Sequence, residues 1–250
     1  MAKSYGSVFE GGGKLRLSDI TGWLDRELEP GKFDDVSNNG VQIARNGCEI
    51  SRVAFGVDAS VAFLERAADA GAQLCVVHHG ISWGGGIRRV TGSDYAVVKA
   101  AMDRNLAVFA SHLPLDANER HGNNWELARL LNLSSVKPAF SYHGNVIGVT
   151  GRALESGVFK VGATEVALEK GQKVGVCSGG AGEFAVEAKA LGCELYLTGE
   201  ASWGDVVAAE NCGMPMVCAG HYETEVFGVR AVAAAMKKAL KVPVVDLTVK

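Results

Sequence analysis

The sequence predicts an α/β fold made of two similar α/β domains, and three observations lead to this prediction. Short apolar runs alternate with amphipathic stretches along most of the 250 residues, as strands alternate with helices. The apolar runs are nearly continuous, which is typical of parallel strands buried on both faces. Residues 52–80 also match residues 173–200 in pattern. In such sheets, ligands gather at the carboxyl ends of the strands.

The internal match indicates a duplication. Residues 52–80 and 173–200 each contain a basic residue, a short strand, a small-residue turn, an amphipathic helix and a second strand. The match continues beyond them, because residues 105–117 align with 213–225 and a helical pattern follows each.

This duplication predicts the domain organisation. We expect a first repeat over residues 1–133 and a second over residues 134–250, with the metal site between them. Residues 134–159 would form the junction, with edge strands and turns. The alternative is that the C-terminal segment, about 226–250, crosses back and completes the first domain.

Composition narrows the class of protein. Hydrophobic residues make up 48% and charged residues 21%, which is ordinary for a globular protein. The net charge of −3 comes without a basic block, so neither nucleic acid nor a membrane is an expected partner. The six cysteines form no CxxC pair and are expected to be reduced thiols. With no signal-peptide pattern at the N-terminus, we expect a cytoplasmic protein.

Histidines are concentrated where apolar runs end. The chain has only six histidines, and four of them follow such runs: His78, His79, His112 and His221. A His-His pair on a regular strand would point to opposite faces, but at the end of a strand both rings can reach one site. Solvated loop histidines are the plainer interpretation of any one of these positions. Three such positions on equivalent strand ends favour a metal site.

A carboxylate follows two of these histidines at the same spacing. Asp116 lies four residues after His112, and Glu225 four residues after His221. His221 and Glu225 would share one face of a helix. Pro114 argues against a regular helix from His112 to Asp116 and indicates a rigid bend instead. A cap or turn is the alternative for either pair.

The number of candidate ligands predicts two metal ions. One catalytic metal needs about three protein ligands, and four histidines with two carboxylates exceed that number. Asp116 and Glu225 would be the natural bridges between two divalent ions. Imidazole and carboxylate ligands fit Zn, Mn, Fe or Co equally well.

Other residues at or near strand ends are weaker candidates. Asp58 and Glu200 lie at strand tips and could relay a proton as catalytic residues. Asn39, Gln42 and Trp83 could line a substrate pocket. A simple turn is the alternative for Asn39 and Gln42, and surface packing is the alternative for Trp83.

Five sequence blocks together resemble the YbgI-like dinuclear metal-centre proteins, which also carry the name GTP cyclohydrolase I type 2. The blocks span nearly the whole chain: NNGVQI (38–43), VVHHGISWGG (76–85), ASHLPLDAN (110–118), YLTGEAS (196–202) and AGHYETE (219–225). The resemblance implies two similar α/β domains and a toroidal homohexamer whose metal sites face an internal cavity. At Gly80 this chain departs from the family, which commonly has proline there.

The resemblance also implies a ligand set. It assigns the dinuclear centre to His78, His79, Asp116, His221 and Glu225, with His112 close to the metals.

Two functions from different classes are compatible with these features. The favoured one is a dinuclear metal-dependent hydrolase that uses metal-bound hydroxide on a small-molecule substrate, with a nucleotide as a candidate. The alternative is a non-enzymatic metal carrier or insertion factor, and a scaffold protein is a third possibility. The absence of a Cys/His-rich tract favours the enzyme.

Overall fold

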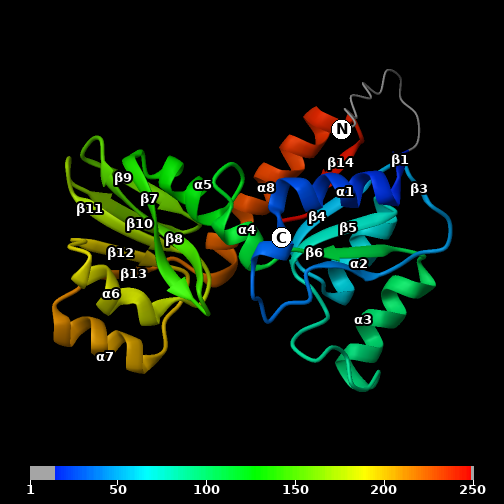
Figure 1. Ribbon diagram of the computed structural model, residues 1–250, viewed down its shortest axis with the longest axis horizontal. Coiled ribbons are helices and arrows are strands. Elements are labelled where there is room, and N and C mark those ends of the chain that lie inside the picture. Colours follow the sequence, from blue (N-terminus) through cyan, green and yellow to red (C-terminus); the bar gives the residue numbers. More distant parts are fainter. Residues whose placement is uncertain (1–14, 249–250) are drawn as a thin grey trace, which may run out of the picture.

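The computed structural model describes residues 15–248 and contains two five-stranded mixed sheets (Figure 1). The first has the order β14-β4-β5-β6-β2, formed by Val244–Asp246, Val53–Asp58, Leu74–His79, Ala107–Ala110 and Gly40–Ile43. Its first four strands are parallel, and β2 is antiparallel to β6. The α/β fold class predicted from the sequence is confirmed.

The second sheet has the order β13-β12-β11-β8-β7, formed by Met216–Cys218, Leu195–Thr198, Lys173–Cys177, Asn145–Ala153 and Leu133–Tyr142. Its first three strands are parallel, whereas β8 is antiparallel to β11 and β7 is antiparallel to β8. Two small antiparallel pairs complete the strands: β1 (Leu15–Arg16) with β3 (Glu49–Ile50), and β9 (Gly157–Val161) with β10 (Thr164–Leu168).

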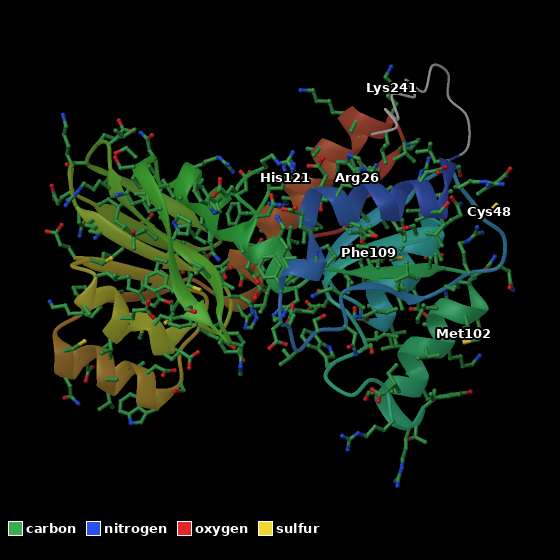
Figure 2. The ribbon with its side chains drawn as sticks, viewed as in Figure 1. Arg26, Cys48, Met102, Phe109, His121 and Lys241 are labelled. Carbon is green, nitrogen blue, oxygen red and sulfur yellow. The ribbon has the colours of Figure 1, made fainter. Side chains whose placement is uncertain are left out.

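The helices cover these sheets. They are α1 (Leu17–Leu28), α2 (Val61–Asp69), α3 (Gly92–Asp103), α4 (Leu113–Ala117), α5 (Asn123–Leu130), α6 (Ala185–Ala190), α7 (Trp203–Cys212) and α8 (His221–Leu240). Short 3-10 turns occur at η1 (Pro30–Lys32) and η2 (Gly182–Phe184). Phe109 of β6 is 1% exposed, whereas Met102 of α3 is 66% exposed. Figure 2 shows Phe109 inside the half of the molecule built around the first sheet, and Met102 pointing outward from it.

The half built around the first sheet and the half built around the second contain the same order of parallel strands and helices. β4, α2 and β5 follow one another in the first half as β11, α6 and β12 do in the second. Glycines end the turns after α2 and α6, at Gly71 and Gly192, where φ is +74° and +75°. These left-handed positions suit glycine, which lacks a Cβ. The duplication itself stays a prediction from the sequence.

The C-terminal helix connects the two halves. α8 begins beside the second sheet and runs onto the first, where β14 pairs in parallel with β4 (Figure 1). Val229, Val232 and Met236 of α8 are buried in the same hydrophobic core as Ile20 and Leu24 of α1. The start of α8 is therefore fixed between the sheets, because burial of its later turns anchors it to the first one.

The expectation that Pro114 argues against a regular helix from His112 to Asp116 is wrong for all but His112, which lies just before the helix. Leu113–Ala117 form the short helix α4, with Pro114 in its first turn. Proline is tolerated there because an N–H group in the first turn has no partner within the helix. The turn carries Asp116 back toward the end of β5.

Candidate metal centre

Six side chains meet at the carboxyl ends of the strands of the first sheet and the start of α8. β5 ends with His78 and His79, the segment after β6 supplies His112 and Asp116, and α8 begins with His221 and Glu225. The rings of His78 and His79 both turn toward this point, with centroids 4.5 Å apart. The structure therefore brings together all six residues that the sequence proposed as ligands.

His78 lies at the bottom of the site and is fully buried. Its Nδ1 atom is 3.0 Å from the carbonyl oxygen of Ser111, which indicates that Nδ1 carries a proton and donates it. Its Nε2 atom then faces two carboxylates, at 3.6 Å from Asp116 Oδ2 and 3.4 Å from Glu225 Oε1. Orientation of the ring by a backbone carbonyl leaves Nε2 available to the site.

The other three histidines each have a carboxylate behind the ring. The Nδ1 atoms of His79, His112 and His221 lie 2.9 Å from oxygens of other residues: Asp58 Oδ1, Asp35 Oδ1 and Glu200 Oε1, respectively. A carboxylate on one ring nitrogen fixes the tautomer and makes the other nitrogen a better metal ligand. Asp58 and Glu200, which the sequence proposed as catalytic, therefore occupy positions that orient His79 and His221.

Glu225 lies at the centre of the site. Its Oε1 atom is 3.1 Å from His221 Nε2, one helical turn back, and its Oε2 atom is 3.4 Å from His79 Nε2. Gly179 makes this position possible, because a Cβ there would lie 2.4 Å from Glu225 Oε1, and its φ of +68° also suits glycine. The two oxygens of Glu225 thus face different histidines.

Hydrogen bonds hold one oxygen of the Asp116 carboxylate. Its Oδ1 atom accepts hydrogen bonds from Asn123 Nδ2 at 2.9 Å and from Ser178 Oγ at 3.0 Å. Asn123 Oδ1 in turn accepts from the backbone N–H of Gly228 in α8. Asp116 therefore presents its Oδ2 atom to the site, and the same network ties α5 to α8.

Two buried polar atoms of the site have no hydrogen-bond partner among residues 15–248: His78 Nε2 and Glu225 Oε2. Buried polar atoms are rarely left unpaired, since this costs about 1–3 kcal/mol each. Bound cations would give both atoms a partner. The residues present therefore fit a metal ion.

The electrostatics of the centre agree with this fit. Burial disfavours the charged form of His78, but the carboxylates of Asp116 and Glu225 raise its pKa to about 10. A hydrogen bond to Glu225 raises the pKa of His221 to about 9. Burial would raise the pKa of Glu225, yet the charge of His78 and the hydrogen bond from His221 hold it well below its ordinary value. The site thus attracts positive charge.

Three overlapping groups of side chains are positioned to bind a metal: His78, His79 and His112; His79, His221 and Glu225; and His78, Asp116 and Glu225. Within each group, the ligand atoms lie within 4.8 Å of one another. The second and third groups share only Glu225. Asp116, expected as a second bridge, belongs to one group.

A cavity of about 440 Å³ opens beside the candidate centre, lined in part by His79, Trp83, His112, His221 and Glu225. Of the three residues proposed for a substrate pocket, Trp83 lines this cavity. Asn39 and Gln42 are not among its lining residues.

Asn39 and Gln42 instead hydrogen-bond to the loops around the site. Asn39 accepts from the His112 N–H and donates to Asp35. Gln42 Oε1 accepts from the N–H groups of Ile81 and Ser82. A Cβ at position 80 would lie 2.2 Å from that oxygen, so Gly80 makes room for Gln42.

Sequence reasoning missed Asp35, Asn123 and Ser178. The side chain of Asp35 is 2% exposed, and hydrogen bonds from His112 and Asn39 overcome its burial and lower its pKa to about 2. Its position just before the Asn38-Asn39 block was the available signal. Asn123 and Ser178 reach Asp116 from α5 and from the end of β11, and nothing in their local sequence indicates this.

A family model described as Duf34/NIF3 (NGG1p interacting factor 3) matches residues 15–250. This chain belongs to the Duf34/NIF3 family. A relative from Deinococcus radiodurans, named GTP cyclohydrolase 1 type 2 homolog, is 38% identical over 247 residues, covering 93% of each chain. A relative of the same name from Pyrococcus horikoshii is 35% identical, covering 88% of this chain and 92% of its own.

Solved structures show the same fold. The protein ybgI superposes with a TM-score of 0.81 at 24% identity, covering 93% of this chain and 98% of its own. Reduced HcgD from Methanocaldococcus jannaschii gives a TM-score of 0.79 at 25% identity, covering 94% and 98%. The resemblance to the YbgI-like proteins is confirmed. In this Duf34/NIF3 chain, none of the helices within residues 15–248 has the length and apolarity needed to cross a bilayer.

Proposed function

We propose that this chain is a dinuclear metal-dependent hydrolase. The observation that carries the proposal is the sharing of Glu225 between two groups of potential ligands that have no other member in common. His79 and His221 would hold one ion, and His78 and Asp116 the other, with Glu225 contributing to both. His112 faces the same space from the side of Asp35.

The chain's own residues prepare this site in three ways. Asp58 and Glu200 orient the rings of His79 and His221 through Nδ1, and the carbonyl of Ser111 orients His78. Asn123 and Ser178 fix Asp116. When bound, two divalent ions would polarise an oxygen of the substrate and activate a water molecule for attack.

The substrate would bind in the cavity beside these residues. The relatives' name, GTP cyclohydrolase 1 type 2 homolog, makes a nucleotide the first candidate to test. The homohexamer implied by the family resemblance stays a prediction.

The test is hydrolysis by protein that has been loaded with Zn, Mn, Fe or Co and screened against nucleotides and phosphoesters. We expect turnover that is lost in Glu225→Gln and retained in Glu223→Gln. Glu223 is the matched control because it lies on the same first turn of α8, and its side chain packs against Gly162 and Gly220. Unchanged turnover in metal-loaded Glu225→Gln would overturn the proposal. Loss of bound metal during incubation with a metal-free client, without any turnover, would favour the carrier alternative.

A further inference from the structure

The cavity beside the candidate centre is walled by apolar and aromatic side chains from both halves. Trp83 follows β5, Tyr142 ends β7, and Phe184 ends η2. Leu113 and Ile147 line the same space. Aromatic and branched side chains of this kind pack against flat ring systems, so the walls favour a planar group in the substrate.

The charged side chains of this cavity, apart from the histidines, are all acidic. Glu183 of η2 and Asp205 of α7 line it together with Asp116 and Glu225. Asp205 is fixed at the wall because its Oδ2 atom accepts a hydrogen bond from the Ser202 N–H at 2.8 Å. Within residues 15–248, none of the lysine or arginine side chains lines the cavity.

Two divalent ions would not reverse this charge. The carboxylates at the centre, behind its histidines and on the cavity wall outnumber the four positive charges that two such ions bring: Asp35, Asp58, Asp116, Glu183, Glu200, Asp205 and Glu225. The space therefore suits a ligand that brings hydrogen-bond donors or positive charge.

The triphosphate group of a nucleoside triphosphate brings negative charge and hydrogen-bond acceptors instead. Sites that bind phosphate groups present arginine, lysine or clustered backbone N–H groups to the oxygens. Here the triphosphate would meet Glu183 and Asp205. A ring with amino, amide or amidine N–H groups would instead donate hydrogen bonds to the same carboxylates.

We propose that the cavity binds a flat, nitrogen-rich ring that is neutral or cationic, and that it rejects nucleoside triphosphates. The ring lies against Trp83, Tyr142 and Phe184, and its N–H groups face Glu183 and Asp205. This assignment rests on the proposed function, because the ring would lie next to the proposed metal ligands, where the reacting bond would have to be.

The test compares ligands that differ in charge. Metal-loaded protein is titrated calorimetrically with guanosine, with GTP supplied with excess Mg²⁺, and with benzamidine as a cationic planar probe. We expect guanosine or benzamidine to bind at least tenfold more tightly than GTP. Glu183→Lys should reduce the ratio of these affinities at least tenfold. Glu210→Lys, a charge reversal on α7 that lies outside the cavity lining, should leave it unchanged.

Two results would overturn the proposal: GTP binding as tightly as guanosine and benzamidine, or binding of none of the three ligands. If the ratio of the affinities for guanosine or benzamidine and for GTP is the same in Glu183→Lys as in the wild type, the role given to Glu183 is also overturned. The readout is binding, so it is independent of turnover. Tight binding of guanosine without hydrolysis would count against the hydrolase and leave this inference standing.

Discussion

His78 Nε2 lies 3.4 Å from Glu225 Oε1, although His78 comes from β5 and Glu225 from α8. Both side chains are almost completely buried. The pair joins the end of the first sheet to the helix that connects the two halves. Since His78 Nε2 and Glu225 Oε2 both lack hydrogen-bond partners among the described residues, a cation at this point would stabilise the folded chain.

Removal of metal should therefore lower the stability of the protein. We expect chelation with EDTA to reduce Tm and added metal to restore it, because an ion that binds only the folded state stabilises it by mass action. Differential scanning calorimetry measures the change. Glu225→Gln should show a smaller response to EDTA than the wild type, and an equal response in both would contradict the assignment of Glu225.

The stability of the metal-free protein should fall at high pH. The pKa of His221 is raised to about 9 and that of His78 to about 10, mainly through their carboxylate neighbours. A group with a raised pKa binds its proton more tightly in the folded state, so its contribution is complete below the ordinary value of 6.5. That contribution is lost as the pH rises through about 9 to 10.

Urea unfolding in EDTA at several pH values measures this dependence. The loss should be smaller in Glu225→Gln, which lacks the carboxylate that both histidines share. A wild-type free energy of unfolding that stays constant from pH 6.5 to 10 would contradict the account.

Glu200→Gln and Asp58→Asn test the carboxylates behind the histidines. Each change keeps the shape of the side chain and removes the charge that orients His221 or His79. We expect metal affinity to fall about 10–100-fold, as is usual for such supporting residues. Competition with a chromogenic chelator gives the affinity. A fall in turnover at unchanged metal affinity would instead make them proton relays, as the sequence suggested.

Asn123→Ala should destabilise the protein by about 1–3 kcal/mol, because it leaves the Gly228 N–H and Asp116 Oδ1 short of a partner. Asn123→Asp is the informative comparison. It keeps an acceptor for Gly228 but places a second carboxylate against Asp116. We expect Asn123→Asp to lose at least as much stability as Asn123→Ala at neutral pH, because a buried carboxylate against Asp116 costs more than the bond to Gly228 returns. Urea unfolding measures this, and an Asn123→Asp protein as stable as the wild type would contradict the role of Asn123 as a donor to Asp116.

The sequence was enough to propose the candidate ligands at the strand ends, because its signals there are local. A histidine after a buried strand and a carboxylate one helical turn after His221 can be recognised without the fold. The contacts of Asp35, Asn123 and Ser178 could not be predicted, because each depends on how segments distant in sequence pack together. Ser178, for example, reaches Asp116 only because the end of β11 lies beside α4.

The helix at Pro114 shows a different limit. The proline suggested a bend, but a helix can begin one residue before it, since the first turn needs no N–H donor there. The role of Gln42 was missed for a similar reason. Its hydrogen bonds to Ile81 and Ser82 depend on the room left by Gly80, which the sequence showed only as a departure from the family.

The most direct test of the central claim is the number of metal ions bound per chain. Purified protein would be stripped, reloaded with Zn or Mn, desalted and analysed by inductively coupled plasma mass spectrometry. The account predicts two ions per chain in the wild type, and at most one in Glu225→Gln, because Glu225 belongs to both proposed groups of ligands. A single ion, or none, in the reloaded wild-type protein would contradict the dinuclear centre.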